Sequence, residues 1–159
     1  MSDYIIAGVY NGLREKLLSE ETRARMSPGA RELWGVLMES GYEKAVATLV
    51  VVVDGTVSLY FSNGGGMIGM GGHEGPRRAG GALLEVAARY PDAAEPTTSY
   101  PLPGRGETQF LFLTREGVRA TRGKDQDLAH ASHPLHALFR QAHEVITEIR
   151  LVSQKVAKK

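Results

Sequence analysis

The stretch AVATLVVVVDGTVSLYFS, residues 45–62, is the part of the chain whose fold is clearest from sequence. Two runs rich in β-branched and aromatic residues flank Asp54-Gly55, a pair typical of a two-residue type I′ turn in which both central residues take positive φ. The stretch therefore predicts a β-hairpin. Because residues 50–53 are consecutive valines, the first strand has no polar face, and we expect it inside the sheet with both faces covered.

Two helices are predicted before this hairpin. The second begins at Ser27-Pro28 and ends at Gly41, because serine suits an N-cap, proline the first helical position and glycine the C-terminus. The first helix is capped by Asp3. Apolar residues at helical spacing form the stripe of the first helix (Ile5, Ile6, Val9, Leu13 and Leu17) and of the second (Leu33, Trp34, Leu37 and Met38).

The chain after the hairpin begins with the glycine-rich segment 64–72, and a third helix is predicted from Pro76 to Pro91. Residues 97–102 suggest an edge strand limited by prolines. The run 109–114 predicts a strongly β strand, which Glu116-Gly117 turns into a short strand at 118–121. A polar loop at 122–132 precedes a last helix from about Pro134 to Lys155, with 156–159 as a frayed tail.

This order of elements predicts the fold class. It is helix, helix, hairpin, glycine-rich segment, helix, short strand, hairpin, helix, without repeats or linkers. We expect a single α+β domain over residues 1–159, in which one antiparallel sheet built from two hairpins is flanked by helices. The helix within residues 1–26 would either pack on this α/β sandwich as a peripheral element or reach out to another copy.

Composition limits the classes of function. The formal net charge is +1, so no strong field favours nucleic acid or an anionic membrane. The absence of cysteine excludes disulfides, thiol nucleophiles and thiolate metal sites. The N-terminus does not resemble a secretory signal, and the longest apolar run, residues 49–53, is far too short to cross a membrane. We therefore expect a cytoplasmic protein without nucleic-acid or membrane partners.

The glycine-rich segment matches a phosphate-binding motif. Gly64-x-Gly66-x-x-Gly69 fits the dinucleotide fingerprint G-x-G-x-x-G, in which glycines let backbone amides approach a pyrophosphate at a helix N-terminus. The fingerprint requires a parallel strand leading into the helix, whereas here the preceding strand is the second arm of a hairpin. Arg77 and Arg78 would lie in the first turn of the helix, where a bound anion would offset their charge.

A second interpretation of the same segment needs no ligand. Glu74 would neutralise the arginines, and the glycines would allow a bend where another backbone comes close, from this chain or from a second copy. We consider this interpretation the better one. Met67, Ile68 and Met70 are apolar residues among the glycines, and they would either pack inside or form a contact surface.

The element order over residues 33–152 resembles the Roadblock/dynein light chain-like domain and, more loosely, profilin-like and longin-like sandwiches. The resemblance rests on element order alone. The glycine-rich loop and the extra N-terminal helix depart from that pattern. It implies a non-enzymatic dimer that scaffolds or regulates partners such as small GTPases.

The histidines and carboxylates do not form a recognisable catalytic or metal motif. His130, His133, His136 and His143 could bind zinc together with His73 only by tertiary placement, and capping or solvated histidines are the simpler expectation. Glu144 and Glu148 are four residues apart on the last helix, as in ordinary surface pairs. We therefore expect no enzymatic activity, cofactor or metal.

The strongest basic cluster consists of Arg115, Arg119 and Arg122, followed by Lys124, near the second hairpin. Glu116 interrupts it, and a polar hairpin end is a better explanation than a nucleic-acid surface.

The function we expect is therefore a homodimeric adaptor or regulatory module that binds another protein. One alternative is a protein that binds a phosphorylated small molecule or nucleotide through Gly64, Gly66, Gly69, Arg77 and Arg78. A further alternative is an immunity or antitoxin-like protein that blocks a cognate toxin.

Overall fold

The computed structural model describes residues 4–26 and 32–157. The strands are β1 (Leu33–Gly41), β2 (Val46–Val52), β3 (Val57–Phe61), β4 (Gly66–Met67), β5 (Glu95–Thr97), β6 (Glu107–Thr114) and β7 (Gly117–Lys124). The helices are α1 (Gly8–Leu17), α2 (Glu20–Met26), α3 (Glu74–Ala87), α4 (Asp125–Leu128) and α5 (His136–Ala157). Two 3-10 turns, η1 (Met70–Gly72) and η2 (Pro91–Ala93), flank α3.

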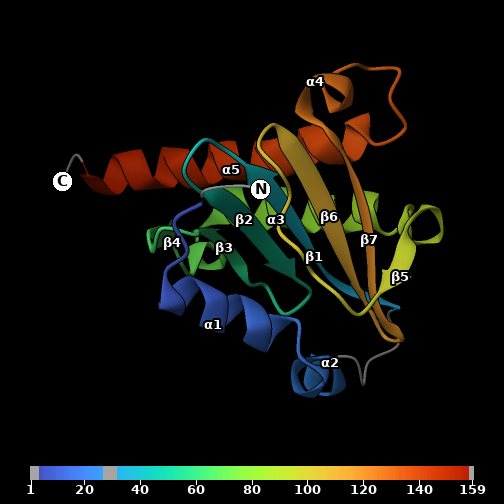
Figure 1. The fold of residues 1–159 in the computed structure, drawn as a ribbon. Coiled ribbons are helices and arrows are strands. Elements are labelled where there is room, and N and C mark those ends of the chain that lie inside the picture. The colour runs from blue at the N-terminus through green and yellow to red at the C-terminus, as the bar shows by residue number, and fades with distance from the viewer. Residues whose placement is uncertain (1–3, 27–31, 158–159) are drawn as a thin grey trace.

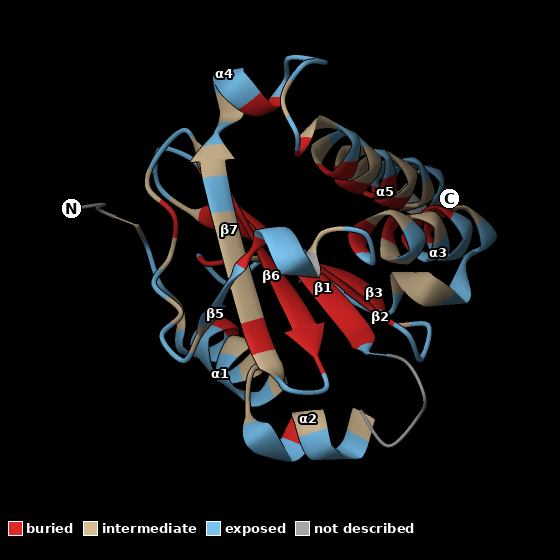
Figure 2. Cartoon of the chain, turned by 90° about the vertical axis from the view of Figure 1, so that its right-hand side faces the viewer, coloured by how far each residue is buried: buried red, intermediate tan, exposed pale blue. Residues whose placement is uncertain are grey.

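Within the described residues, the strands form one open, seven-stranded antiparallel sheet in the order β4-β3-β2-β1-β6-β7-β5 (Figure 1). The molecule has three layers. Helices α3 and α5 cover one face of the sheet, and α1 and α2 lie on the other (Figure 2). The sequence prediction of an α+β chain with one antiparallel sheet and flanking helices is confirmed.

Each face of the sheet has its own apolar core. The core under α3 and α5 is the larger and includes Phe110, Phe112, Leu83, Leu138 and Ile149. The core on the opposite face is built around Trp34, Leu37 and Leu113, against which Leu17 at the end of α1 and Leu18 just after it pack. The N-terminal helices are therefore a layer of the domain, because they cover a face that would otherwise expose apolar side chains.

The hairpin at residues 45–62 is confirmed as β2 and β3, and every residue of β2 is buried, as expected for a strand covered on both faces. The predicted type I′ turn is wrong. Among the described residues only glycines have positive φ, so Gly55 at +98° meets the requirement and Asp54 does not. The Asp54 carboxylate accepts a hydrogen bond from the Thr56 amide at 2.9 Å, and this Asx turn stabilises the loop without positive φ at the aspartate.

The predicted second helix is wrong, because its described part is the central strand β1. All nine residues of β1 are buried between β2 and β6. A register shift between Leu33 and Gly35 reverses the alternation, so Leu33 and Val36 face one core while Trp34 and Leu37 face the other. Apolar residues three positions apart therefore lie on the same face of this strand, and their spacing in the sequence is the same as that of an apolar stripe on a helix. The proposed start at Ser27-Pro28 lies outside the described residues.

The first helix begins later than predicted and buries a different face. Ile5 and Ile6 precede the helix in a segment whose amides bond to carbonyls of the sheet end, Ile5 to Lys44 and Ala7 to Ser62. Tyr10 is the buried residue of α1, whereas Ile5, Ile6 and Val9 are exposed. The predicted stripe is therefore wrong at these three residues, and the Asp3 cap lies outside the described residues.

The remaining predictions differ mainly at element ends. Helix α3 begins at Glu74 rather than Pro76, and the predicted strand at 97–102 is the shorter edge strand β5 at 95–97. Strand β7 extends to Lys124, so the predicted polar loop contributes a strand end and then α4. Helix α5 continues to Ala157, which corrects the frayed tail at 156–157. None of the helices in the described ranges combines the length and apolar character that crossing a bilayer requires.

Candidate functional site

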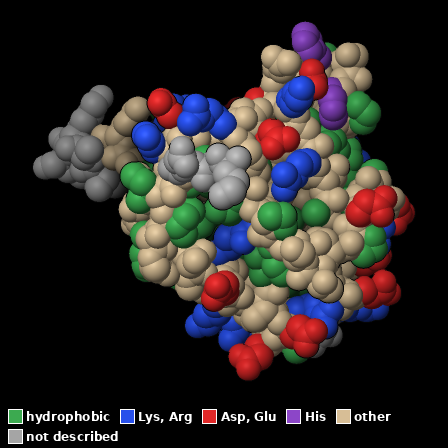
Figure 3. Space-filling view, viewed as in Figure 1, with side chains coloured by type: hydrophobic (Ala, Val, Ile, Leu, Met, Phe, Trp, Pro, Cys, Tyr) green, Lys and Arg blue, Asp and Glu red, His purple; other side chains and the backbone are tan. Residues whose placement is uncertain are grey.

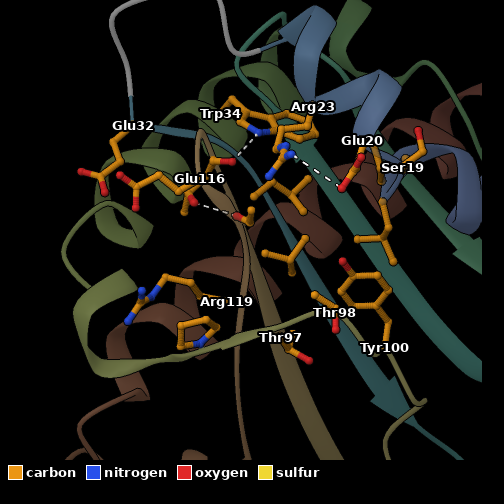
Figure 4. Close-up of a pocket in the computed structure, with 17 residues that line it drawn as sticks. Ser19, Glu20, Arg23, Glu32, Trp34, Thr97, Thr98, Tyr100, Glu116 and Arg119 are labelled. Atoms are coloured by element: carbon orange, nitrogen blue, oxygen red, sulfur yellow. Dashed lines mark hydrogen bonds and ion pairs between the residues drawn. The ribbon is translucent and has the colours of Figure 1, made fainter.

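A cavity of about 370 Å³ lies between the N-terminal helices and the sheet (Figure 4). Its floor is the apolar sheet surface at Trp34, Leu113 and Val118. Leu17 and Leu18 at the end of α1 form one wall. Thr97 at the end of β5 forms the opposite wall together with Thr98 and Tyr100 of the segment that follows. The sequence prediction missed this cavity, which we call the α2 pocket.

Arg23 of α2 points into the α2 pocket (Figure 4). Its side chain is 33 % exposed, and its Nη2 atom lies 3.9 Å from Oε1 of Glu20, whose side chain is 93 % exposed. This separation is longer than a hydrogen bond. The guanidinium also lies against Gly117, where a Cβ would come within 3.4 Å of Nη1. The pocket therefore combines an apolar floor, walls of mixed polarity and a cation whose ion pair is weak.

A buried ion pair fixes α1 to the sheet next to the pocket. Glu39 of β1 is fully buried, and Arg14 of α1 donates to both of its carboxylate oxygens, from Nε at 2.7 Å and from Nη2 at 2.8 Å. Thr48 Oγ1 and Gln109 Nε2 donate to the same carboxylate at 2.9 and 2.7 Å. A buried carboxylate requires such complete pairing, because desolvation otherwise disfavours its charge.

The same network holds the segment that forms the pocket's far wall. Arg14 Nη2 donates to the Tyr100 carbonyl at 2.8 Å, and Gln109 Nε2 donates to the Pro101 carbonyl at 2.9 Å. Tyr4 Oη donates to the Pro103 carbonyl at 2.8 Å. Pro101 and Pro103 have no backbone N–H to donate to a neighbouring strand. Side chains therefore hold this segment on the sheet face by donating hydrogen bonds to its carbonyls. The pocket walls are thus held in place by contacts within the chain.

Tyr10 completes the network on α1. Its hydroxyl shares a 2.7 Å hydrogen bond with Thr48 Oγ1, next to Glu39. Burial, together with the nearby Glu39 carboxylate, raises the pKa of Tyr10 to about 12. The tyrosine is therefore neutral at physiological pH, which suits a structural hydrogen bond and not acid–base chemistry.

The glycine-rich segment folds onto its own hairpin. A Cβ at Gly66 would lie 2.7 Å from the Leu59 carbonyl oxygen, and one at Gly71 would overlap the Gly55 carbonyl oxygen. Gly64 and Gly69 have positive φ, at +106° and +74°. The glycines thus provide the close backbone approach that the ligand-free interpretation expects, and the neighbouring backbone belongs to the same chain.

The arginines at the start of α3 are engaged within the chain. Arg78 pairs with Glu74, which agrees with the interpretation in which Glu74 offsets its charge. Arg77 is exposed, and its Nη1 donates to the Gly71 carbonyl at 3.5 Å. The open depression in front of this segment includes Gly69 and Arg77, and it also includes the carboxylate of Asp54. This arrangement does not favour an anion.

The three apolar residues of the glycine-rich segment have different surroundings. Met67 and Met70 are half-buried and pack against the core under α3 and α5. Ile68 is 64 % exposed. Only Ile68 of the three is therefore well placed to contribute to a contact surface.

Three histidines of the C-terminal part, His133, His136 and His143, make capping or packing contacts. His133 Nδ1 accepts a hydrogen bond from the Leu135 amide at 3.0 Å, so it helps to begin α5 as predicted. His136 Nδ1 lies 2.9 Å from the Leu128 carbonyl oxygen and donates to it. His143 meets the ring of Phe139 edge-on at 4.5 Å, and burial lowers its pKa. Within residues 4–26 and 32–157, no three His, Asp or Glu side chains are grouped as metal ligands.

The other candidate charges also make local contacts. The Glu148 carboxylate lies over Gly75 at the beginning of α3, where the positive end of the helix dipole favours a negative charge. Arg119 donates to the Ala94 carbonyl at 2.8 Å, and Arg122 donates to Gln109 Oε1 at 2.6 Å. The predicted basic cluster therefore includes two arginines that hold neighbouring segments.

The outward side of residues 5–12 is apolar and exposed to solvent. Ile5, Ile6 and Val9 are 55 %, 40 % and 61 % exposed, and Gly8 and Gly12 are exposed beside them. We call these five residues the α1 outer face. In the space-filling view from the same side as Figure 1, hydrophobic side chains gather at the left, where the chain enters α1, and charged ones gather along the lower edge near α2 (Figure 3).

Sequence signals existed for part of what the prediction missed. Arg14 interrupts the apolar side of a helix, and Glu39 interrupts an apolar run, which together suggest a buried pair. The pocket gave no such signal, because its lining comes from α1, α2, the four strands β1, β5, β6 and β7, and the segment after β5. Comparison of the chain with protein-family models, with curated proteins and with solved structures found no match.

Proposed function

We propose that this protein is a non-enzymatic interaction module whose first partner is a second copy of itself, joined through the α1 outer face. The observation that carries the proposal is the pair Gly8 and Gly12, four residues apart in α1. Around the Cβ position of each, no described heavy atom lies within 4 Å apart from chain neighbours and nearby helix backbone. Packing within the described chain therefore does not require glycine at either position.

These glycines weaken the helix that contains them. A glycine inside a helix costs roughly 1 kcal/mol relative to alanine, because it loses more backbone entropy on folding. The exposed Ile5 and Val9 lie beside them and add apolar surface in water. A second helix packed closely over the glycines would bury this surface, since the distance between helix axes depends on the side chains at the contact.

The interface must extend beyond α1. A helix of ten residues is only about 15 Å long, whereas a stable interface usually buries more than about 1,000 Å² in total. The turn before β4 is adjacent, because a Cβ at Gly64 would lie 3.4 Å from the Ala7 Cβ. A two-fold arrangement that pairs α1 with its copy would bring this turn toward the interface as well.

An adaptor role is the kind of function that such a dimer supports. The outward surfaces of α3 and α5, which cover the opposite face of the sheet, stay available for another protein while the α1 outer faces are joined. The resemblance to Roadblock-like domains implies the same class of function, with a small GTPase as one possible kind of partner. The alternative of phosphate or nucleotide binding gains no support, because Arg78 pairs with Glu74 and the glycine-rich segment packs on its own hairpin.

Engineered cysteines test the proposed contact directly, because the natural chain contains no cysteine. Disulfides form when two Cα atoms approach to about 4.4–6.8 Å, and residues near a two-fold axis meet their own copies. We expect at least one of Gly8→Cys, Val9→Cys and Gly12→Cys to form a disulfide-linked dimer under mild oxidation. The matched control is Gly81→Cys in α3, where the glycine also has open space. If all three α1 variants oxidise no faster than this control, the proposal is wrong.

A further inference from the structure

We propose that the α2 pocket binds a small organic carboxylate with an apolar body, and that Arg23 pairs with the carboxylate. This binding site is independent of the dimer proposed above. It would make the protein a ligand-binding module in addition to an interaction module.

The size and lining of the pocket suit a small apolar body. Its volume of about 370 Å³ is near the lower end of the roughly 300–1,000 Å³ typical of ligand sites. Leu17, Leu18 and Tyr100 are half-buried around it, so part of their surface faces the cavity above Trp34. A hydrocarbon or ring seated there would remove apolar surface from water on both sides, which is the main source of affinity in such sites.

The charges at the pocket favour an anionic end on the ligand. Arg23 is the more enclosed partner of a long ion pair, and Glu20 is almost fully in solvent. Glu32 and Glu116 are exposed at the rim, where water and salt screen their charge. A ligand carboxylate inside the pocket would meet the guanidinium in a less polar environment, where charge-assisted hydrogen bonds are stronger.

The walls are already in place, which lowers the entropic cost of binding. Arg14 and Glu39 attach α1 to β1, and the same guanidinium holds the Tyr100 carbonyl. The two sides of the pocket are therefore connected through one buried network. A ligand that enters would have to order few additional groups.

The experiment uses the natural fluorescence of the protein. Trp34 is the only tryptophan of the chain and lies at the pocket floor, so its emission responds to changes at this site. The probes share one ring: cyclohexylacetate is the anion, cyclohexylacetamide the neutral form and 2-cyclohexylethylamine the cation. None absorbs where tryptophan does. We expect a saturable change in Trp34 emission with the carboxylate, at a dissociation constant at least tenfold lower than for the other two.

Two variants connect the binding to Arg23. Arg23→Gln should weaken binding of cyclohexylacetate at least tenfold, because it removes the charge and keeps a polar side chain of similar length. Arg25→Gln is the matched control in the same helix, and its exposed side chain does not line the pocket, so binding should change less than twofold. Urea unfolding of each variant, followed by circular dichroism, confirms that both remain folded.

Three outcomes would overturn the proposal. One is the absence of a saturable Trp34 response to any of the three probes. Another is tighter binding of the cation or the amide than of the carboxylate. The third is an equal effect of Arg23→Gln and Arg25→Gln in folded protein. None of these results bears on dimer formation, so the two proposals fail independently.

Discussion

Arg14 and Glu39 are the residues that connect the N-terminal layer to the sheet. Their side chains are 11 % and 0 % exposed, and the carboxylate receives hydrogen bonds from three residues. Burying two charges is unfavourable unless the pairing is complete, so the pair contributes more to the position of α1 than to net stability. Removal of one partner should therefore lower the free energy of unfolding by much more than the pair contributes to it in total.

Arg14→Met tests this expectation. The variant leaves the Glu39 carboxylate buried without its cation, and we expect the free energy of unfolding to fall by about 3–5 kcal/mol in urea titrations. Arg25→Met removes an exposed arginine from the next helix and should change stability by less than about 0.5 kcal/mol. Adding Glu39→Gln to Arg14→Met should recover part of the loss. Equal effects of the two arginine variants would show that the buried pair is unimportant.

His143 should make stability depend on pH. Burial lowers the pKa of His143, an effect that the charge of Arg150 reinforces and that of Asp125 opposes. The unfolded chain, with a histidine pKa of about 6.5, therefore binds a proton at pH values where the native protein does not. The stability contributed by neutral His143 is fully present above about pH 6.5 and is lost as the pH falls toward the lower native pKa.

The measurement is urea unfolding between about pH 7.5 and pH 5, comparing the native chain with His143→Gln. The native chain should lose stability over this range more steeply than the variant. His130→Gln, at an exposed residue, serves as the control and should retain the native slope. The same slope in the native chain and in His143→Gln would contradict the assignment.

At the scale of elements, the hairpin at 45–62 was predictable because its signals are local: β-branched runs and an Asp-Gly turn. Strand β1 was not, because a strand buried on both faces has no alternating pattern. The register shift near Gly35 then places apolar residues three apart on one face. A window of sequence cannot distinguish that spacing from a helix, since the distinction depends on pairing with β2 and β6.

The glycine-rich segment offers a matched pair of substitutions at adjacent residues. At Gly71 a Cβ would overlap the backbone of Gly55, whereas at Gly72 no described atom would come within 4 Å. Gly71→Ala should therefore destabilise the protein by about 1–3 kcal/mol, as overpacking does. Gly72→Ala should be neutral or stabilise it by up to about 1 kcal/mol, because it restricts the unfolded chain.

Thermal unfolding of the two variants, at equal protein concentration, checks this prediction. A lower midpoint for Gly71→Ala alone would establish that the segment is anchored on its own hairpin. Equal midpoints would contradict that packing and would make a more mobile, ligand-accessible loop the better description.

At the scale of the whole molecule, sequence predicted the class of the fold and not its surfaces. The α2 pocket and the α1 outer face both depend on which side of α1 faces the sheet. The apolar spacing of Ile5, Ile6 and Val9 indicated the wrong side, because Tyr10 and Arg14 are the residues that turn inward. Polar groups with buried partners thus decided the orientation of the helix, and their partners lie far away in sequence.

The measurement that tests the central claim most directly is solution mass by light scattering, for the native chain and for Val9→Asp. We expect the native chain to have twice its monomer mass of 17.2 kDa and Val9→Asp to be a folded monomer. Ala24→Asp places the same charge on the exposed side of α2 and should remain dimeric. A native chain of 17.2 kDa at every concentration, or a Val9→Asp variant as dimeric as the native chain, would contradict the account.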